Sequence, residues 1–135
     1  MEKENFIRIL QNFNKKRILV IGDLMLDHYV WGKVDRISQE APVPVVAVTR
    51  EEYRLGGAAN VVNNLASLGA VPTVIGIHGD DHFSEKLKKL LKEKNIEIKN
   101  LIADSSRPTI VKSRVISHNQ QVVRIYINSV AQIDI

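Results

Sequence analysis

Three groups of polar residues in this sequence have side chains and spacing suited to binding a small molecule. The first comprises Asp23 and Asp27, which follow the apolar run 17–21. A carboxylate at the carboxyl end of a buried strand can accept hydrogen bonds from vicinal sugar hydroxyls, and each charged bond contributes about 1.5–3 kcal/mol. An aspartate there can also cap backbone amides in a turn. We favour the capping role for Asp23 and ligand contact for Asp27.

The second group is the diglycine Gly56–Gly57 followed by Asn60. Residues without side chains let the backbone approach a ligand closely, and a helix starting here would offer free amide groups. The segment lacks the Lys-Ser/Thr ending of a P-loop and the third glycine of a dinucleotide fingerprint, so we do not expect it to bind a nucleotide. Asn60 could contact a sugar hydroxyl or belong to a capping network, and the sequence leaves both open.

The third group lies on a hairpin expected near the C-terminal end of the sequence. It consists of Lys112, Arg114, Asn119, Gln121 and Arg124. Strand alternation places Lys112 and Arg114 on one face, and such cations hold a phosphate well. Isolated cations on strands are more often simply solvated, which is the alternative for this group.

A fourth cluster, His78, Asp80, Asp81 and His82, has residue types that bind metals. It stands where a predicted strand passes into a predicted helix, and aspartates in that place usually cap the helix. We therefore expect capping here and no metal site.

The composition is that of one soluble globular domain. The chain has 135 residues, 44% hydrophobic and 25% charged, enough for a single core. It has no cysteine, which excludes disulfides, thiolate metal sites and a cysteine nucleophile. No apolar run approaches the roughly 20 residues of a membrane span. We expect a cytoplasmic protein that is neither secreted nor bound to a membrane.

The net charge of +4 raises the question of an acidic partner. Much of the positive charge lies at five lysines that alternate with apolar residues at helical spacing, so they form the solvated face of an amphipathic helix. These are Lys86, Lys88, Lys89, Lys92 and Lys94. The sequence lacks the aromatic platform or arginine-rich stripe of a nucleic-acid groove, so we expect no nucleic-acid partner.

The order of apolar runs and helical patterns predicts an α/β fold. The run 17–22, ended by glycine, is typical of a central parallel strand covered on both faces by helices. A helix is expected to follow from the diglycine, and Gly69 is expected to end it in the left-handed conformation. After this helix we expect a strand at 73–77, a helix capped by Asp80 or Asp81, and a β-rich stretch at 96–102. This order implies a doubly wound sheet.

Other β-rich regions are expected to form a lid. Residues 26–33 and 43–49 are β-rich, but Pro42 and Pro44 cannot donate to a neighbouring strand, so this segment belongs at a sheet edge or in a flap. Residues 109–116 and 121–127 alternate like a hairpin. A short amphipathic helix is predicted at 4–14, before the first strand.

Several ordered motifs together resemble the ribokinase, or PfkB, family of carbohydrate kinases. They are Gly-Asp-Leu-Met-Leu-Asp-His-Tyr at 22–29, Arg-Ile-Ser-Gln-Glu-Ala-Pro-Val-Pro-Val at 36–45, Gly-Gly-Ala-Ala-Asn-Val at 56–61, Asn-Gln-Gln at 119–121, and Arg124. They span the chain from about residue 17 to residue 124, so the resemblance is far more specific than the diglycine alone. It is closest to the branch that phosphorylates D-glycero-D-manno-heptose 7-phosphate.

The resemblance implies a ribokinase-like α/β fold, a doubly wound, mostly parallel sheet with a small β lid. Residues 1–135 would be its N-terminal half, with lid strands at about 26–49 and 109–127. The residues implied to bind the sugar are Asp27, Gly56, Gly57 and Asn60. Those implied to contact the substrate's own phosphate are Lys112, Gln121 and Arg124. Lids of this kind often form a homodimer contact.

The activity implied by the resemblance is transfer of the ATP γ-phosphate to the anomeric hydroxyl of the heptose, with Mg²⁺, in making ADP-heptose for lipopolysaccharide. The family's Gly-Ala-Gly-Asp loop, which carries the catalytic base, does not occur in these 135 residues, and neither does the ATP pocket. We therefore expect no catalytic residue and no bound cofactor here, and a chain that is inactive alone.

Two other interpretations stay open. One is another sugar or nucleoside kinase of the same family. The basic cluster at 112–124 distinguishes it from a heptose 7-phosphate kinase, since a substrate that is already phosphorylated needs cations that a neutral sugar does not. The other is a non-catalytic sugar-binding or dimerising fragment, which the absent base favours.

Overall fold

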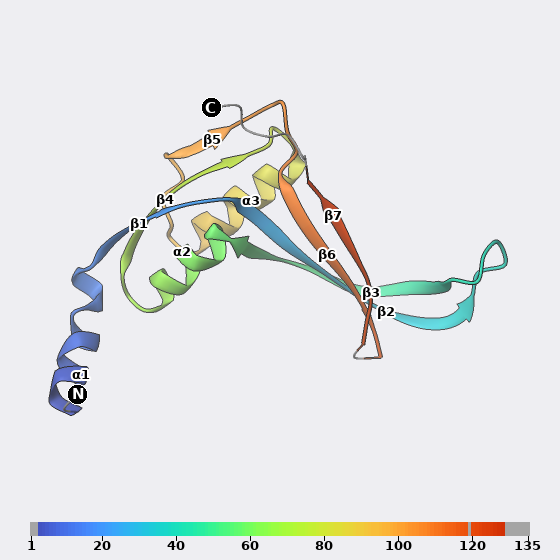
Figure 1. Cartoon of the computed structure of the whole chain (residues 1–135), viewed down its shortest axis with the longest axis horizontal. Helices are drawn as coiled ribbons and strands as arrows, with labels where there is room; N and C mark the ends of the chain where they lie inside the picture. Colours follow the sequence, from blue (N-terminus) through green and yellow to red (C-terminus); the bar gives the residue numbers. More distant parts are fainter. Residues whose placement is uncertain (1–2, 119, 129–135) are drawn as a thin grey trace.

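The computed structural model describes residues 3–118 and 120–128, and it divides them between two sheets and the helices beside them (Figure 1). The chain begins with helix α1 (Lys3–Gln11) and a short 3-10 turn (Phe13–Lys15). Helix α1 lies at one end of the molecule and the tip of a long hairpin at the other (Figure 1). No residue of α1 is buried, so the predicted N-terminal helix is present but packs on little of the described chain.

The first sheet is parallel and has the strand order β1-β4-β5. Its strands are β1 (Arg17–Ile21), β4 (Val71–His78) and β5 (Leu101–Ala103). Helix α2 (Ala58–Ser67) connects the hairpin to β4, and helix α3 (His82–Glu93) follows β4. The predicted α/β class with a parallel sheet is confirmed.

Two details of the first sheet differ from the expectation. Strand β1 is an edge strand, and Leu19 and Ile21 are 55% and 71% exposed, so helices do not cover both of its faces. The β-rich stretch at 96–102 forms a strand only from Leu101, because Ile96 instead turns into the core, where it is 4% exposed.

The second sheet is the lid, and its strand order is β3-β2-β6-β7. Its strands are β2 (Leu24–Ile37), β3 (Pro44–Gly57), β6 (Ile110–Ser117) and β7 (Gln120–Ile127). β2 pairs antiparallel with β3 and parallel with β6, and β7 returns antiparallel to β6. The two predicted segments therefore do form one sheet, with the prolines at its outer tip.

The first lid hairpin is longer than the expected range 26–49. The pairing of β2 with β3 continues inward to Leu24 and Gly57, so the diglycine ends a strand as well as preceding a helix. The β-propensity of residues 50–57 is low, but their pairing with the buried start of β2 extends the strand.

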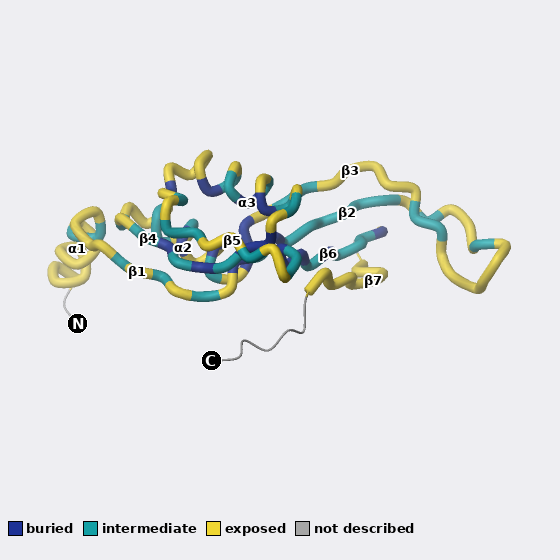
Figure 2. The backbone as a smooth tube through the Cα atoms, turned by 90° about the horizontal axis from the view of Figure 1, so that it is seen from above, coloured by how far each residue is buried: buried dark blue, intermediate teal, exposed yellow. Residues whose placement is uncertain are grey.

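The hydrophobic core lies where the inner end of the lid sheet meets the helices, as the buried segments show (Figure 2). Leucines from β2 and from α3 meet valines from α2 and β4. The fully buried members are Leu24, Leu26, Ala59, Val62, Val74, Leu87, Leu91 and Val111. The lid is thus anchored to the first sheet by its inner end, while its tip and β7 are exposed (Figure 2).

Local signals at two helix ends behave as predicted. Gly69 follows α2 with φ of +86°, the left-handed conformation in which glycine carries no steric penalty. Asp81 caps α3 by accepting a hydrogen bond from the Ser84 amide at 2.9 Å. No helix of the described chain is long and apolar enough to cross a membrane.

Candidate functional site

The register of the lid strands places acidic, basic and aromatic residues on one face of that sheet. Side chains of directly paired residues lie on the same side, and every second residue along a strand joins them. We call the set the charged face of the lid. Its members are Asp27, Tyr29, Trp31, Arg50, Glu52, Arg54, Lys112, Arg114 and Arg124.

Asp27, the predicted sugar ligand, is held in the middle of the charged face. Arg114 Nη1 donates to Asp27 Oδ1 at 2.6 Å, and both side chains are about three-quarters buried, with exposed fractions of 25% and 22%. The hydrogen bond to Asp27 raises the pKa of Arg114 above its usual value. The same guanidinium also donates to the Lys112 carbonyl at 3.3 Å. Asp27 is therefore fixed through one oxygen.

The second oxygen of Asp27 lies against the diglycine. A Cβ added at Gly56 would come within 2.8 Å of Asp27 Oδ2, so a side chain there would displace the carboxylate. Gly57 has φ of +54°, and a Cβ there would come within 2.6 Å of the Asp23 carbonyl oxygen. Both glycines are thus required by close packing around the start of β2.

Asp23 does not act as predicted. Its side chain is exposed, and it is the Asp23 backbone carbonyl that accepts a hydrogen bond from the Ala58 amide at 3.0 Å. The start of α2 is therefore tied to the start of β2 through the main chain, without a side-chain cap.

A hollow of about 560 Å³ opens at the β3 edge of the lid, between that strand, α2 and the end of α3. Side chains from both faces of β3 reach it. The residues that line it are Asp27, Tyr29, Glu52, Tyr53, Arg54, Leu55, Asn60, Asn63, Leu90, Glu93 and Lys94. The hollow brings together Asp27 and Asn60, which are 33 positions apart in the sequence and were both expected to contact a sugar.

The other predicted residues do not line the hollow. Gly56 and Gly57 adjoin it through their contacts with Asp27 and with the start of β2. Lys112 pairs with Asp27 across the strands, on the side away from β3. Arg124 lies opposite Arg114 on β7, is exposed, and donates from Nε to Gln121 Oε1 at 3.1 Å. Asn119 lies outside the described residues.

Several residues of the hollow were missed by the sequence analysis. Tyr29 ends the motif at 22–29 but was given no role, and Arg54 belongs to no motif. Alternation from Asp27 and pairing across the hairpin put both on the same face. The guanidinium carbons of Arg54 and Arg114 lie 5.0 and 5.2 Å from the Tyr29 ring centroid. Tyr29 in turn stacks on Trp31 at 5.6 Å. Alternation could have found Tyr29, whereas Arg54 needed the register.

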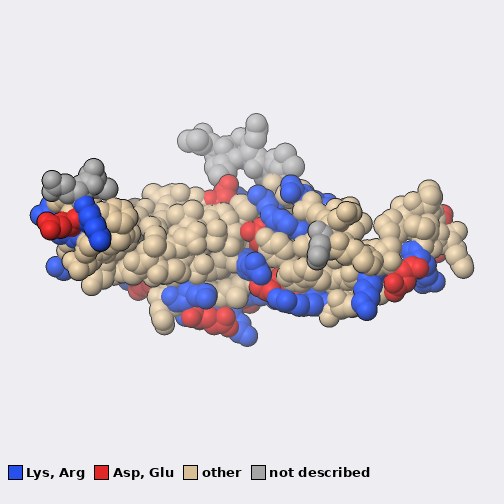
Figure 3. Space-filling model, turned by 90° about the horizontal axis from the view of Figure 1, so that it is seen from below, with Lys and Arg blue, Asp and Glu red and all other residues tan. Residues whose placement is uncertain are grey.

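Glu52 links two arginines on the outer strand. It accepts a hydrogen bond from Arg54 Nε at 2.6 Å and another from Arg50. The bond from Arg54 is the main cause that lowers the pKa of Glu52 and raises that of Arg54. Across the visible face of the molecule, basic and acidic side chains are similarly interleaved in small groups (Figure 3).

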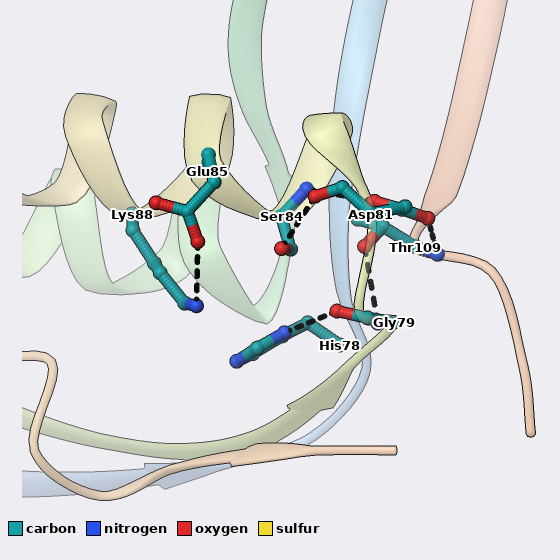
Figure 4. A network of polar contacts seen from close by, with 7 residues as sticks. All are labelled: His78, Gly79, Asp81, Ser84, Glu85, Lys88 and Thr109. Carbon is teal, nitrogen blue, oxygen red and sulfur yellow. Dashed lines mark hydrogen bonds and ion pairs between the residues drawn. The ribbon is translucent and has the colours of Figure 1, made fainter. Parts of the chain in front are cut away.

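The cluster considered for a metal is a structural corner instead (Figure 4). Asp81 Oδ1 accepts from the Ser84 amide at 2.9 Å and Oδ2 from the Thr109 amide at 2.8 Å. Thr109 Oγ1 accepts from the Gly79 amide at 3.0 Å, and the His78 ring nitrogen Nδ1 lies 2.6 Å from the Gly79 carbonyl oxygen. Within residues 3–118 and 120–128, no three His, Asp or Glu side chains are grouped to hold a metal.

The sequence matches known proteins over nearly its whole length. The model of the pfkB family of carbohydrate kinases matches residues 15–134. The chain itself is 52% identical to the bifunctional protein HldE of Aliarcobacter butzleri over 120 residues, which is 89% of this chain. It is 51% identical over 109 residues, 81% of this chain, to the bifunctional protein HldE of Campylobacter concisus. The chain spans about a quarter of the length of these relatives, 25% and 23%.

Solved structures show the same fold. A carbohydrate kinase from Agrobacterium tumefaciens superposes with a TM-score of 0.66 at 20% identity, over 82% of this chain and 35% of that one. A nucleoside kinase of Methanocaldococcus jannaschii, described as an archaeal member of the ribokinase family, gives 0.62 at 18% identity, over 82% and 36%. The arrangement of lid and parallel sheet is therefore the ribokinase-like one, present in part.

Proposed function

Because this chain belongs to the pfkB family of carbohydrate kinases, we propose that it is the sugar-binding part of a kinase that phosphorylates D-glycero-D-manno-heptose 7-phosphate at the anomeric hydroxyl. Family membership implies a phosphotransferase that acts on a carbohydrate. The heptose as substrate, and a place in making ADP-heptose for lipopolysaccharide, are the finer part of the proposal. The shared name of the relatives, bifunctional protein HldE, supports this finer part, because the chain is about half identical to them over the matched residues.

The observation that carries the proposal is the meeting of Asp27 and Asn60 in one hollow beside the diglycine. A carboxylate accepts hydrogen bonds from two adjacent hydroxyls, and a side-chain amide both donates and accepts, which suits a ring of hydroxyls. Gly56 keeps the space beside Asp27 Oδ2 free of a side chain. We propose that Asp27 and Asn60 bind the sugar, and that Gly56 and Gly57 bring the backbone close to it.

The contribution of this chain to the reaction is positioning. Holding the sugar in one orientation removes much of the entropic barrier to phosphoryl transfer, in which little covalent work falls to the protein. ATP and Mg²⁺ would supply the phosphoryl group and the charge that stabilises its transfer. The Gly-Ala-Gly-Asp loop, which carries the catalytic base of the family, does not occur in this sequence. We therefore propose that this chain alone binds sugar without phosphorylating it.

The phosphate that the heptose already carries needs cations. Lys112 and Arg124 lie on the charged face of the lid, and Gln121 is bonded to Arg124. We propose these three residues as contacts for the substrate's phosphate. A kinase of a neutral sugar or nucleoside, the nearest rival, would have no use for them.

We further propose that two copies of the chain associate through their lids in the cytoplasm. Among the strands that the structure describes, β7 is at an edge of the lid sheet, where backbone groups can pair with another strand. It also carries exposed apolar side chains, which are Val122, Val123, Ile125, Tyr126 and Ile127. Sedimentation of the chain at several concentrations tests this, and a monomer at all of them would contradict it.

Calorimetric titration of the purified chain with heptose 7-phosphate tests the proposed substrate, with ribose and fructose 6-phosphate as comparisons. We expect selective binding of the heptose phosphate. Asp27→Ala should abolish it. Asp23→Ala is the matched control, because the Asp23 side chain is exposed and the substitution keeps the backbone carbonyl that bonds the Ala58 amide. Equal binding of all three sugars would make this a different sugar kinase. No binding by a folded chain would contradict the proposed sugar site.

A further inference from the structure

The residues that line the hollow include two cations, Arg54 and Lys94. Neither belongs to the hairpin of β6 and β7, whose cations Lys112 and Arg124 we call the hairpin cations. We infer that Arg54 is the principal contact for the phosphate group of a sugar phosphate whose hydroxyls are bound at Asp27. This inference rests on the proposed function, since it presumes a phosphorylated sugar in the hollow. It assigns the charge selectivity of the site to Arg54 of β3, a residue that the sequence motifs left without a role.

The register places Arg54 where a substrate held by Asp27 would meet it. The two residues are directly paired between β2 and β3, so their Cβ atoms lie on the same face about 4.5–5.5 Å apart. Both line the same hollow. A sugar that is hydrogen-bonded to Asp27 thus has a guanidinium beside it on the hollow's own side.

The Arg54 guanidinium is oriented but not used up. Its Nε donates to Glu52 Oε1 at 2.6 Å, and the group lies over the Tyr29 ring at 5.0 Å. A guanidinium has five N–H donors, so the bond to Glu52 leaves the four of its two terminal nitrogens. Within the described part of the chain, no hydrogen bond from those nitrogens is recorded. Two terminal nitrogens held in one plane match the oxygens of a phosphate.

The charges around the hollow favour an anion once the neighbours are counted. The lining holds Asp27, Glu52 and Glu93 against Arg54 and Lys94. Two cations from outside the lining change this balance, because Arg114 pairs with Asp27 and Arg50 pairs with Glu52. The group then holds four cations against three carboxylates, so the positive charge of Arg54 is not cancelled.

The hairpin cations are less well placed to be the main contact. Arg124 lies on β7, two strands beyond Asp27, a separation of roughly 10 Å at the usual strand spacing. Lys112 is next to Asp27, but on the far side from β3, and it does not line the hollow. Arg124 is thus farther from Asp27 than Arg54 is, and Lys112 would contact the phosphate from outside the hollow.

The test compares two arginines of the same face in the 135-residue chain. Heptose 7-phosphate and unphosphorylated heptose are titrated into the wild type, Arg54→Gln and Arg124→Gln, after a denaturation curve has shown that each variant is folded. We expect Arg54→Gln to lose about tenfold to a hundredfold in affinity for the phosphorylated sugar only. Arg54→Lys should restore part of the loss, and Arg124→Gln should lose less than Arg54→Gln.

Other outcomes separate the two proposals. If Arg124→Gln loses more affinity for the phosphorylated sugar than Arg54→Gln does, the inference about Arg54 is overturned and the proposed function stands. The same holds if Arg54→Gln loses equal affinity for both sugars. A wild type that binds both sugars equally would contradict the phosphorylated substrate itself.

A second measurement does not depend on the sugar. Inorganic phosphate is titrated into the ¹⁵N-labelled chain while the Nε–Hε signals of the arginines are followed by NMR. We expect a saturable shift of the Arg54 signal that exceeds the shift of the Arg124 signal. An unchanged Arg54 signal, or a larger shift at Arg124, would count against Arg54 whether or not the heptose binds.

Discussion

Asp27 and Asp81 lie in two regions of the molecule that use the same side chain in opposite ways. Asp27 lies within β2 and Asp81 follows β4. The partner of Asp27 is Arg114 on β6, and one partner of Asp81 is Thr109, which immediately precedes β6. Asp81 gives both oxygens to backbone amides, those of Ser84 and Thr109. Asp27 gives one oxygen to the Arg114 side chain, and its other oxygen lies beside Gly56. Both aspartates join distant segments, but only Asp27 keeps acceptor capacity next to a hollow.

The difference shows how an aspartate committed to structure can be told from one available to a ligand. Backbone amides are fixed in position, so the Asp81 carboxylate is locked into the corner of Figure 4 and binds β4, α3 and β6 together. The Arg114 guanidinium, by contrast, stands on a long side chain, so it can move with the Asp27 carboxylate when that carboxylate also bonds a ligand. The unused acceptor, more than the ion pair, therefore marks the candidate site.

The largest expected effect is on ligand binding at Asp27. Asp27→Asn keeps the size of the side chain but removes its charge and one acceptor, so affinity for heptose 7-phosphate should fall about a hundredfold, equivalent to roughly 3 kcal/mol. Calorimetric titration measures it. Asp81→Asn is the matched control, and it should bind the sugar as the wild type does. Equal losses in both variants would remove the distinction between the two aspartates.

The next effect is on stability at Asp81. Asp81→Ala removes the cap of α3 and the acceptor for the Thr109 amide, and should lower the free energy of unfolding by about 2 kcal/mol. Urea denaturation measures the change. Asp80→Ala is the control, because Asp80 is an exposed neighbour of the same type. Similar losses in the two variants would show that the Asp81 bonds are not the cause.

The pH dependence of stability sharpens the contrast further. Burial works to raise the pKa of Asp81, but the hydrogen bonds from the Thr109 and Ser84 amides together hold this pKa below its usual value. Because the folded pKa is below the unfolded value of about 3.9, the unfolded state binds more protons in that range. The stabilisation from Asp81 is therefore complete above about pH 4 and is lost as the pH falls through the folded pKa.

Denaturation of wild type and Asp81→Asn between neutral pH and about pH 2.5 measures this dependence. The gap between their unfolding free energies should narrow in acid. The comparison removes the contributions of other carboxyls with lowered pKa, such as Asp104. A gap that stays constant over the whole range would contradict the role given to the Asp81 charge.

The smallest effect is expected at the ion pair beside the corner. Lys88 Nζ lies 2.9 Å from Glu85 Oε1 on the surface of α3, and the Glu85 side chain is 74% exposed. Solvent screens a pair with such an exposed partner, so Glu85→Gln, which keeps the packed Lys88 side chain, should not measurably change the urea midpoint. A loss as large as that of Asp81→Ala would mean that side-chain pairs as well as backbone amides hold this corner.

Much of the fold could be predicted because its signals are local. The apolar run before Gly22, the left-handed Gly69 and the cap at Asp81 each depend on residues within a few positions of one another. The misjudged features depended on distant partners. Strand β3 runs on to Gly57 because it pairs with the start of β2. Leu19 and Ile21 of β1 are exposed because no described helix packs on that face.

The candidate site could be predicted only in part. Motifs pointed to Asp27 and Asn60, and the hollow contains both. They also pointed to Lys112, Gln121 and Arg124, which it does not contain. Spacing along one strand could not show that Arg54 faces Asp27, because that neighbourhood depends on the turn and on the register of the hairpin.

The sequence by itself determined the α/β class, the helix ends and the membership in a kinase family, because propensities, caps and motifs act over short stretches of chain. Only the tertiary structure decided which residues surround the two oxygens of Asp27, and which cations lie beside it. Arg114, which bonds Asp27, is 87 positions away in the sequence, and Arg54, which pairs with it across the strands, is 27 positions away. Such contacts arise from strand order and register, and those are set by how the whole core packs.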